Sequence, residues 1–83
     1  MPTFDWQERI SVHPDVCHGR PCIRGTRIMV SLLLDYIQAG EPTEAILEQY
    51  PQLAAEDVRA ALAYAAWLAH EEERQPLHTV ATG

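Results

Sequence analysis

The chain has 83 residues, a length that suits one small domain and excludes a multidomain enzyme, a βαβ nucleotide-binding unit with a substrate site, and a repeat array. Hydrophobic residues make up 47% of the sequence and charged residues 22%, so the chain is too apolar to be disordered and should fold around a core. The net charge of −6 is unevenly divided, because residues 1–34 carry +1 and residues 35–83 carry −7. This balance argues against broad, nonspecific nucleic-acid binding and restricts any anion-binding surface to the first half.

Cysteine usage and hydropathy indicate a cytoplasmic protein. Cys17 and Cys22 do not make a disulfide framework, and the N-terminus has no basic flank followed by an apolar run. The longest uncharged apolar run, residues 60–69, has ten residues, about half of what a membrane-spanning helix needs. We expect a single domain over residues 1–76, a flexible tail over 77–83, no membrane segment and no cofactor.

Residues 1–28 predict a small β arm. Two prolines, two glycines and short β-branched pieces break any helical period between residues 9 and 27, and Ile10 and Val12 alternate with polar neighbours as in a short strand. Further extended pieces are expected at residues 22–23 and 27–28, on either side of Gly25.

Residues 29–73 predict three helices. Apolar residues at helical spacing begin at about Met29, and Gly40 stands where a left-handed residue ends a helix. The expected helices cover residues 29–39, about two turns between Pro42 and Pro51, and about 56–73. The third has core spacing at Val58, Ala61, Leu62, Ala65 and Leu68. This order of two short helices, a tight turn and a longer helix predicts a mainly α fold with a helix-turn-helix arrangement.

Four possible metal ligands crowd the turn of the arm. Zinc sites normally pair two ligands across a short knuckle and place a second pair further along the chain, which these residues do not. We therefore favour buried thiols and a surface histidine over a metal site. A thiol nucleophile is favoured still less, because no evident orienting carboxylate or oxyanion hole lies nearby, and we expect no catalytic residue and no enzyme. The four residues are His13, Cys17, His18 and Cys22.

Residues 19–27 are the most distinctive segment, with three arginines, two glycines and a threonine. Guanidinium groups are rigid forks of donors, and glycines let backbone N–H groups approach a ligand, so the segment suits phosphates or a partner's carboxylates. The alternative is a turn whose arginines pair with the acidic helices of the same chain. The candidate nucleic-acid contacts are Arg20, Arg24, Thr26, Arg27 and, on the third helix, Arg59.

The composition of the third helix makes base recognition by this helix alone doubtful. A major-groove helix exposes long polar side chains, whereas Arg59 is the only long basic residue between Asp57 and His70. Its many alanines favour close contact with another helix or a second copy, and an ordinary core helix is the alternative. Its aromatic residues are either core fillers or interface anchors, and its terminal glutamates oppose the helix dipole and favour a cationic partner. The candidate partner contacts are Trp6, Tyr64, Trp67, Glu71, Glu72 and Glu73.

The segment RISVHPDVCHGRPCIRGTRI, followed by ILEQYPQL and EDVRAALAYA, resembles the bacterial and archaeal family called domain of unknown function 433. The resemblance covers roughly Trp6 to Ala66, and its CxGxPxIxGTRI core is specific. It implies a homeodomain-like three-helix unit after a small β element and, for many members, an antitoxin beside a PIN-type ribonuclease toxin. This chain has Arg20 where a lysine is common, Met29 where a proline often opens the first helix, and Ala54 where a hydroxyl residue often lies.

The leading function predicted with this resemblance is an antitoxin of a type II toxin–antitoxin pair. The acidic second half would cover the RNA-binding groove of a PIN-like ribonuclease toxin, and the two proteins together would bind operator DNA and repress their operon. A homodimer is expected, because a two-fold protein matches a palindromic site. The alternatives are a stand-alone helix-turn-helix DNA-binding regulator and a non-enzymatic interaction module, with a small metalloenzyme a distant fourth.

Overall fold

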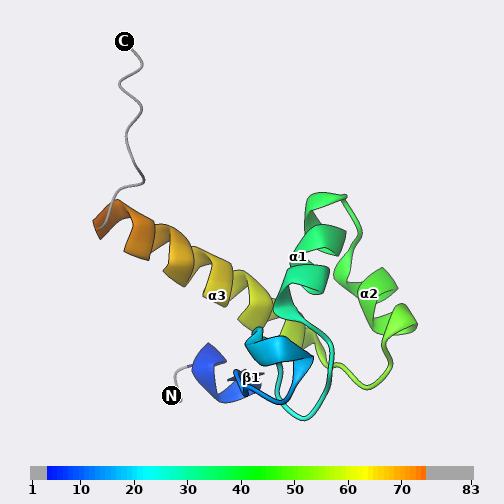
Figure 1. Cartoon of the computed structure of the whole chain (residues 1–83). Helices are drawn as coiled ribbons and strands as arrows, with labels where there is room; N and C mark the ends of the chain where they lie inside the picture. Colours follow the sequence, from blue (N-terminus) through cyan, green and yellow to red (C-terminus); the bar gives the residue numbers. More distant parts are fainter. Residues whose placement is uncertain (1–3, 75–83) are drawn as a thin grey trace.

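The structure is a computed structural model that describes residues 4–74. Figure 1 shows α1 and α2 beside the N-terminal part of α3, whose C-terminal half extends away from these two helices. The predicted tail, residues 77–83, lies outside the described residues. The elements are η1 (Trp6–Arg9), β1 (Ile10–Ser11), η2 (Cys17–Gly19), β2 (Cys22–Ile23), α1 (Val30–Gln38), α2 (Thr43–Gln49) and α3 (Ala55–Arg74).

The predicted fold class is confirmed: a small β arm precedes three helices. β1 and β2 pair antiparallel, with Ile10 opposite Ile23. After β2 the chain turns back on itself. The Ile23 N–H donates to the Ile28 carbonyl at 2.9 Å across this turn. The first strand is shorter than expected and ends at Ser11, and Val12 is 62% exposed.

Two short 3₁₀ turns in the arm were not expected. The first, η1, is capped by Asp5, whose carboxylate accepts the Gln7 N–H at 3.0 Å. The second, η2, has left-handed backbone at Cys17 (φ 51°) and His18 (φ 57°). Turns of three or four residues show no hydrophobic period, so the sequence pattern does not reveal them.

The three helices lie close to their predicted bounds. α1 ends as expected at Gly40 (φ 90°), whose N–H donates to the Ile37 carbonyl at 3.0 Å. Pro42 is the N-cap of α2, which begins at Thr43. Among residues 4–74, none of the helices has the length and apolar character needed to cross a membrane.

The core lies where the arm and the three helices meet. Leu33 of α1, Ile46 of α2 and Ala61 of α3 are almost completely buried, together with Ile23 of the arm. α3 contributes to this core only with its first half. Leu62 and Leu68, assigned to the core by their spacing, are 47% and 40% exposed.

The exposure of these two leucines has different causes. Leu62 lies about 100° around the helix from the buried Ala61, outside the strip that the core covers. Leu68 lies nearly below Ala61, but two turns further along, beyond the last buried residue of α3. Helical period gives the direction of a side chain and not the length of helix that a small body can cover.

The start of α3 is fixed by Asp57, which is 8% exposed. One carboxylate oxygen accepts the Ala54 N–H at 2.9 Å, and the other accepts from Arg9 Nη1 at 3.0 Å. The first contact supplies half of a capping box at a position where Ala54 has no capping oxygen. The second joins the helix to η1.

Candidate functional site

The arginine-rich segment, residues 19–27, has polar side chains of two kinds. Internal ones are bonded within the chain, and free ones make no such contact among the described residues. The Arg24 side chain is exposed but bonded within the chain: its Nε donates to the Glu8 carbonyl at 2.7 Å and its Nη2 to the Ile10 carbonyl at 3.2 Å. Its guanidinium therefore attaches η1 and β1 to the turn that follows β2. The alternative of pairing with the acidic helices is not what the structure shows for this arginine, since it binds backbone carbonyls.

Thr26 closes the turn of the hairpin. Its hydroxyl donates to the Ile23 carbonyl at 2.8 Å and accepts the Ile28 N–H at 3.0 Å. Gly25 stands at the tip with a left-handed φ of 81°. The hydroxyl hydrogen and one oxygen lone pair of Thr26 are thus used inside the turn. One lone pair remains for a ligand.

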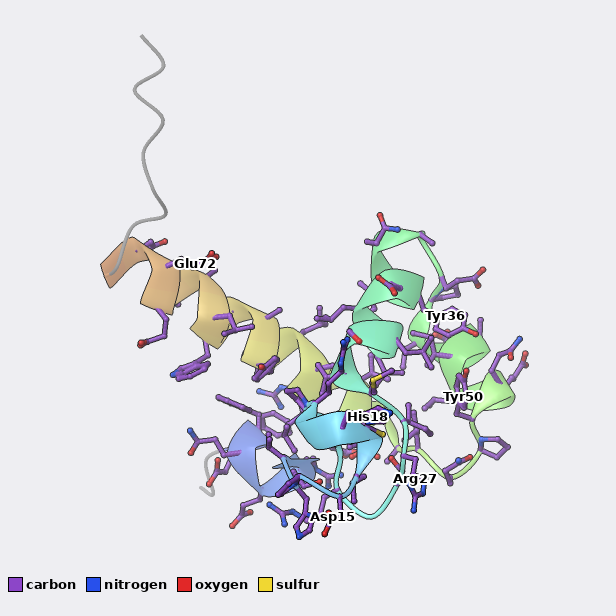
Figure 2. All side chains as sticks on the ribbon, in the orientation of Figure 1. Asp15, His18, Arg27, Tyr36, Tyr50 and Glu72 are labelled. Carbon is purple, nitrogen blue, oxygen red and sulfur yellow. The ribbon has the colours of Figure 1, made fainter. Side chains whose placement is uncertain are left out.

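Arg20 and Arg27 are the free groups of this segment. Both side chains are exposed, and within residues 4–74 neither makes a hydrogen bond or an ion pair. The backbone at Arg27 is held by the Cys17 thiol, which donates to its carbonyl at 3.3 Å. Figure 2 shows the Arg27 side chain at the outer edge of the arm. These two guanidinium groups are available for an anion.

Arg59, the fifth predicted nucleic-acid contact, has different surroundings. Its guanidinium carbon lies 4.0 Å from the centre of the Phe4 ring, a cation–π contact. It lines a surface hollow with Thr43 and Leu62, whereas Arg27 lines another with Ser11. Arg59 and Arg27 therefore lie on different surface hollows, one on α3 and one on the arm.

The outer surface of α1 and α2 is acidic. Glu41 and Glu48 line an open hollow of about 420 Å³ together with Tyr36. The Tyr36 ring packs edge-on against Tyr50, with ring centres 6.1 Å apart. The hydrogen bond with Tyr50, and next its burial, raise the pKa of the Tyr36 hydroxyl. This side of the molecule repels nucleic-acid phosphates and favours cationic groups.

Three of the predicted partner contacts form one aromatic cluster. The Trp6 ring centre lies 5.8 Å from that of Tyr64 and 6.0 Å from that of Trp67, and the latter two are 6.2 Å apart. The cluster attaches η1 to α3, so Trp6 docks within its own chain. Trp67 is still 43% exposed. The core-filler interpretation therefore holds for the contacts within this cluster, and the interface anchor stays a prediction for the exposed side of Trp67.

The predicted glutamates continue α3 beyond this cluster. Glu71 follows Trp67 by one turn, and Glu72 follows Leu68 by one turn, so the two pairs share one side of the helix. Figure 2 shows Glu72 near the far end of α3. Glu73 lies next to His70, with 3.4 Å between Oε1 and Nδ1. The result is an apolar and acidic surface that projects from the body.

The two cysteines belong to the arm, Cys17 in η2 and Cys22 in β2. Cys22 is buried, and burial, followed by the hydrogen bond with the Cys17 thiol, raises its pKa from 9.0 to about 11. Within the described part of the chain, no three His, Cys, Asp or Glu side chains are grouped closely enough to hold a metal ion. A protonated thiol at neutral pH is a poor nucleophile.

Several of these features have no signal in the sequence. Arg9 and Asp57 are 48 positions apart, and nothing in their local patterns links them. The exposed Leu62 and Leu68 look like core residues by spacing. A comparison of the predicted length of α3 with that of α1 and α2 is the one available signal, because a longer helix must project beyond shorter neighbours.

Comparisons with known proteins agree with this architecture. Residues 10–65 match the model of a family described as "Protein of unknown function (DUF433)". A relative described as uncharacterized protein y4eO, from Sinorhizobium fredii (strain NBRC 101917 / NGR234), is 39% identical over 59 residues, which cover 71% of this chain and 27% of that protein. The crystal structure of a DUF433 member from Anabaena variabilis ATCC 29413 superposes with a TM-score of 0.71 at 40% identity, over 83% of this chain and 68% of the other.

Proposed function

The chain belongs to the DUF433 family of proteins of unknown function, and from this premise we propose that it is the antitoxin of a type II toxin–antitoxin pair. It binds a PIN-like ribonuclease toxin through the projecting half of α3 and acts by occlusion. The ribonuclease must attract RNA with a basic groove, and an acidic helix competes for that groove. This role requires no catalytic residue of the chain.

The observation that carries the proposal is the projecting surface formed by Trp67, Leu68, Glu71 and Glu72. Trp67 and Leu68 are 43% and 40% exposed, which is costly for a lone protein and typical of an interface anchor. Glutamates one turn further provide the charge that a basic groove selects. The aromatic cluster holds Trp67 in place before binding, so little side-chain entropy is lost on association.

In this proposal the antitoxin and its toxin bind operator DNA together, as a complex. The exposed start of α3 offers Ala55 and Glu56 where a recognition helix needs donors, so the helix does not read bases well. Arg20 and Arg27 supply two phosphate contacts from the arm. Two contacts are few against a net charge of −6, so a basic toxin must provide the rest.

Co-expression tests the antitoxin proposal. The tagged chain is produced with the reading frames that flank its own, and stoichiometric companions are identified and assayed for ribonuclease activity with and without the chain. We expect one basic companion whose activity is suppressed. Glu72→Lys and Trp67→Ala should weaken inhibition by about tenfold or more. Glu48→Lys makes the same charge change on α2 and serves as the matched control.

Two outcomes would overturn this assignment of the projecting surface. The chain could purify without a stoichiometric companion, or Glu72→Lys could leave the inhibition unchanged. The second candidate, a stand-alone DNA-binding regulator, is favoured by the free Arg20 and Arg27. Binding to DNA from upstream of the gene separates the two, because the regulator binds tightly alone. Alanine at both arginines should lower the salt slope by about 1.8 in log units, whereas lysine at both should keep it.

A further inference from the structure

α3 has a second exposed face, distinct from the one proposed to bind a toxin. Residues at steps of three and four along the helix fall on one stripe, which is the spacing of a helix–helix contact. All members of this stripe are exposed, and Leu62, 47% exposed, is the largest apolar one. The stripe, called here the 59–73 face, consists of Arg59, Leu62, Ala66, Ala69 and Glu73.

The charges at the two ends of the 59–73 face are opposite. Arg59 stands seven residues before Ala66, and Glu73 stands seven residues after it. When two copies of the helix run antiparallel about a two-fold axis near Ala66, each Arg59 meets Glu73 of the second copy. A parallel arrangement would instead place like charges together at both ends.

The apolar positions of the face fit the same arrangement. In the antiparallel pair Leu62 of each copy lies over Ala69 of the other, so a large side chain faces a small one. The alanines let the two helices approach closely. We propose that the chain forms a homodimer through antiparallel pairing of the 59–73 faces of α3.

Two further observations bear on a second copy of the chain as the occupant of this face. The Arg59 guanidinium carbon lies 4.0 Å from the centre of the Phe4 ring, so this side chain is already ordered by a contact within its own chain. A surface hollow of about 340 Å³ borders Arg59 and Leu62 at the start of α3 and continues to Ala55 and Thr43. The end of the helix of the second copy passes over this hollow. Trp67 and Glu71 lie on the other side of α3, so the dimer leaves the proposed toxin surface free.

Analytical ultracentrifugation of the full chain tests the pairing without any toxin, so its outcome is independent of the proposed function. One pair of helices is a small interface, so we expect a reversible dimer of twice 9.4 kDa with a dissociation constant on the order of micromolar. Arg59→Glu and Glu73→Arg should each weaken the dimer by about tenfold or more, because each creates two like-charge contacts. The double variant should restore it to near the wild-type value.

Two control variants and a check of folding separate the pairing from other effects. Glu72→Arg makes the same charge change as Glu73→Arg on a neighbouring side of the helix and should leave the dimer unchanged. Phe4→Ala removes the ring under Arg59 while keeping its charge, and should retain most of the dimer. Circular dichroism checks that each variant is folded. The proposal is overturned by a chain that stays monomeric, by a dimer indifferent to both single variants, or by a double variant as weak as the singles.

Discussion

Asp57→Ala tests the local account of the fold most directly, because one carboxylate starts α3 and attaches it to the arm. Loss of the contact with the Ala54 N–H, 2.9 Å long, should cost about 1 kcal/mol, as for other lost helix caps. Loss of the contact with Arg9 should cost about 1.5 kcal/mol, at the low end for a charged hydrogen bond, because the Arg9 side chain is 40% exposed and partly screened. The two losses together amount to roughly 2–3 kcal/mol.

Thermal and denaturant unfolding measure this change. For a domain of this size, a loss of that order lowers the midpoint by roughly 10–20 °C. A double-mutant cycle with Arg9→Ala separates the terms, because the coupling free energy reports the ion pair and the remainder reports the helix start. Glu56→Ala, one residue earlier and exposed, should cost at most about 1 kcal/mol. If Asp57→Ala cost no more than this control, the assigned role of the carboxylate would be refuted.

Two further predictions concern the arm. Arg24→Ala should destabilise the fold by about 1–2 kcal/mol in urea unfolding, because it removes both carbonyl contacts, whereas Arg27→Ala should stay within about 0.5 kcal/mol; equal losses would contradict the division between internal and free arginines. The raised pKa of Cys22, about 11 against 9.0, means that the folded state keeps a proton that the unfolded state releases, so stability should fall as the pH rises from 9.0 to about 11. Cys22→Ala should flatten that decline, and an unchanged profile would show that the thiol does not cause it.

Local signals in the sequence predicted the order and bounds of the main elements. The end of α1 at Gly40 is predictable because glycine readily adopts a left-handed backbone, which depends on that residue alone. The apolar period before Gly40 is a local signal as well. The turn at Gly25 follows for the same reason. The pairing of Ile10 with Ile23 is one that a sequence can predict, because few registers of two such short strands bury both side chains.

The contacts of the candidate site were harder to predict from the sequence, because they join distant parts of the chain. Composition marks Arg24 and Arg27 as equals, and only the position of the Glu8 and Ile10 carbonyls makes the first internal. Trp6 is similar, since its packing partners Tyr64 and Trp67 are far along the sequence. These outcomes depend on tertiary geometry that a periodic pattern does not encode.

The length of α3 links the fold to both proposals. A helix that only completed the core could end near Tyr64, because the described residues beyond that position are mostly exposed. The additional turns place two surfaces on different sides of one rigid rod, with Trp67 and Glu72 on one and Ala66 and Glu73 on the other. An isolated amphipathic extension gains little stability without a partner, so its apolar side chains are best explained by association. In the proposed dimer, Glu73 therefore differs in role from Glu71 and Glu72, although the three are the same residue type: its direction around the helix would place it opposite Arg59 of a second copy.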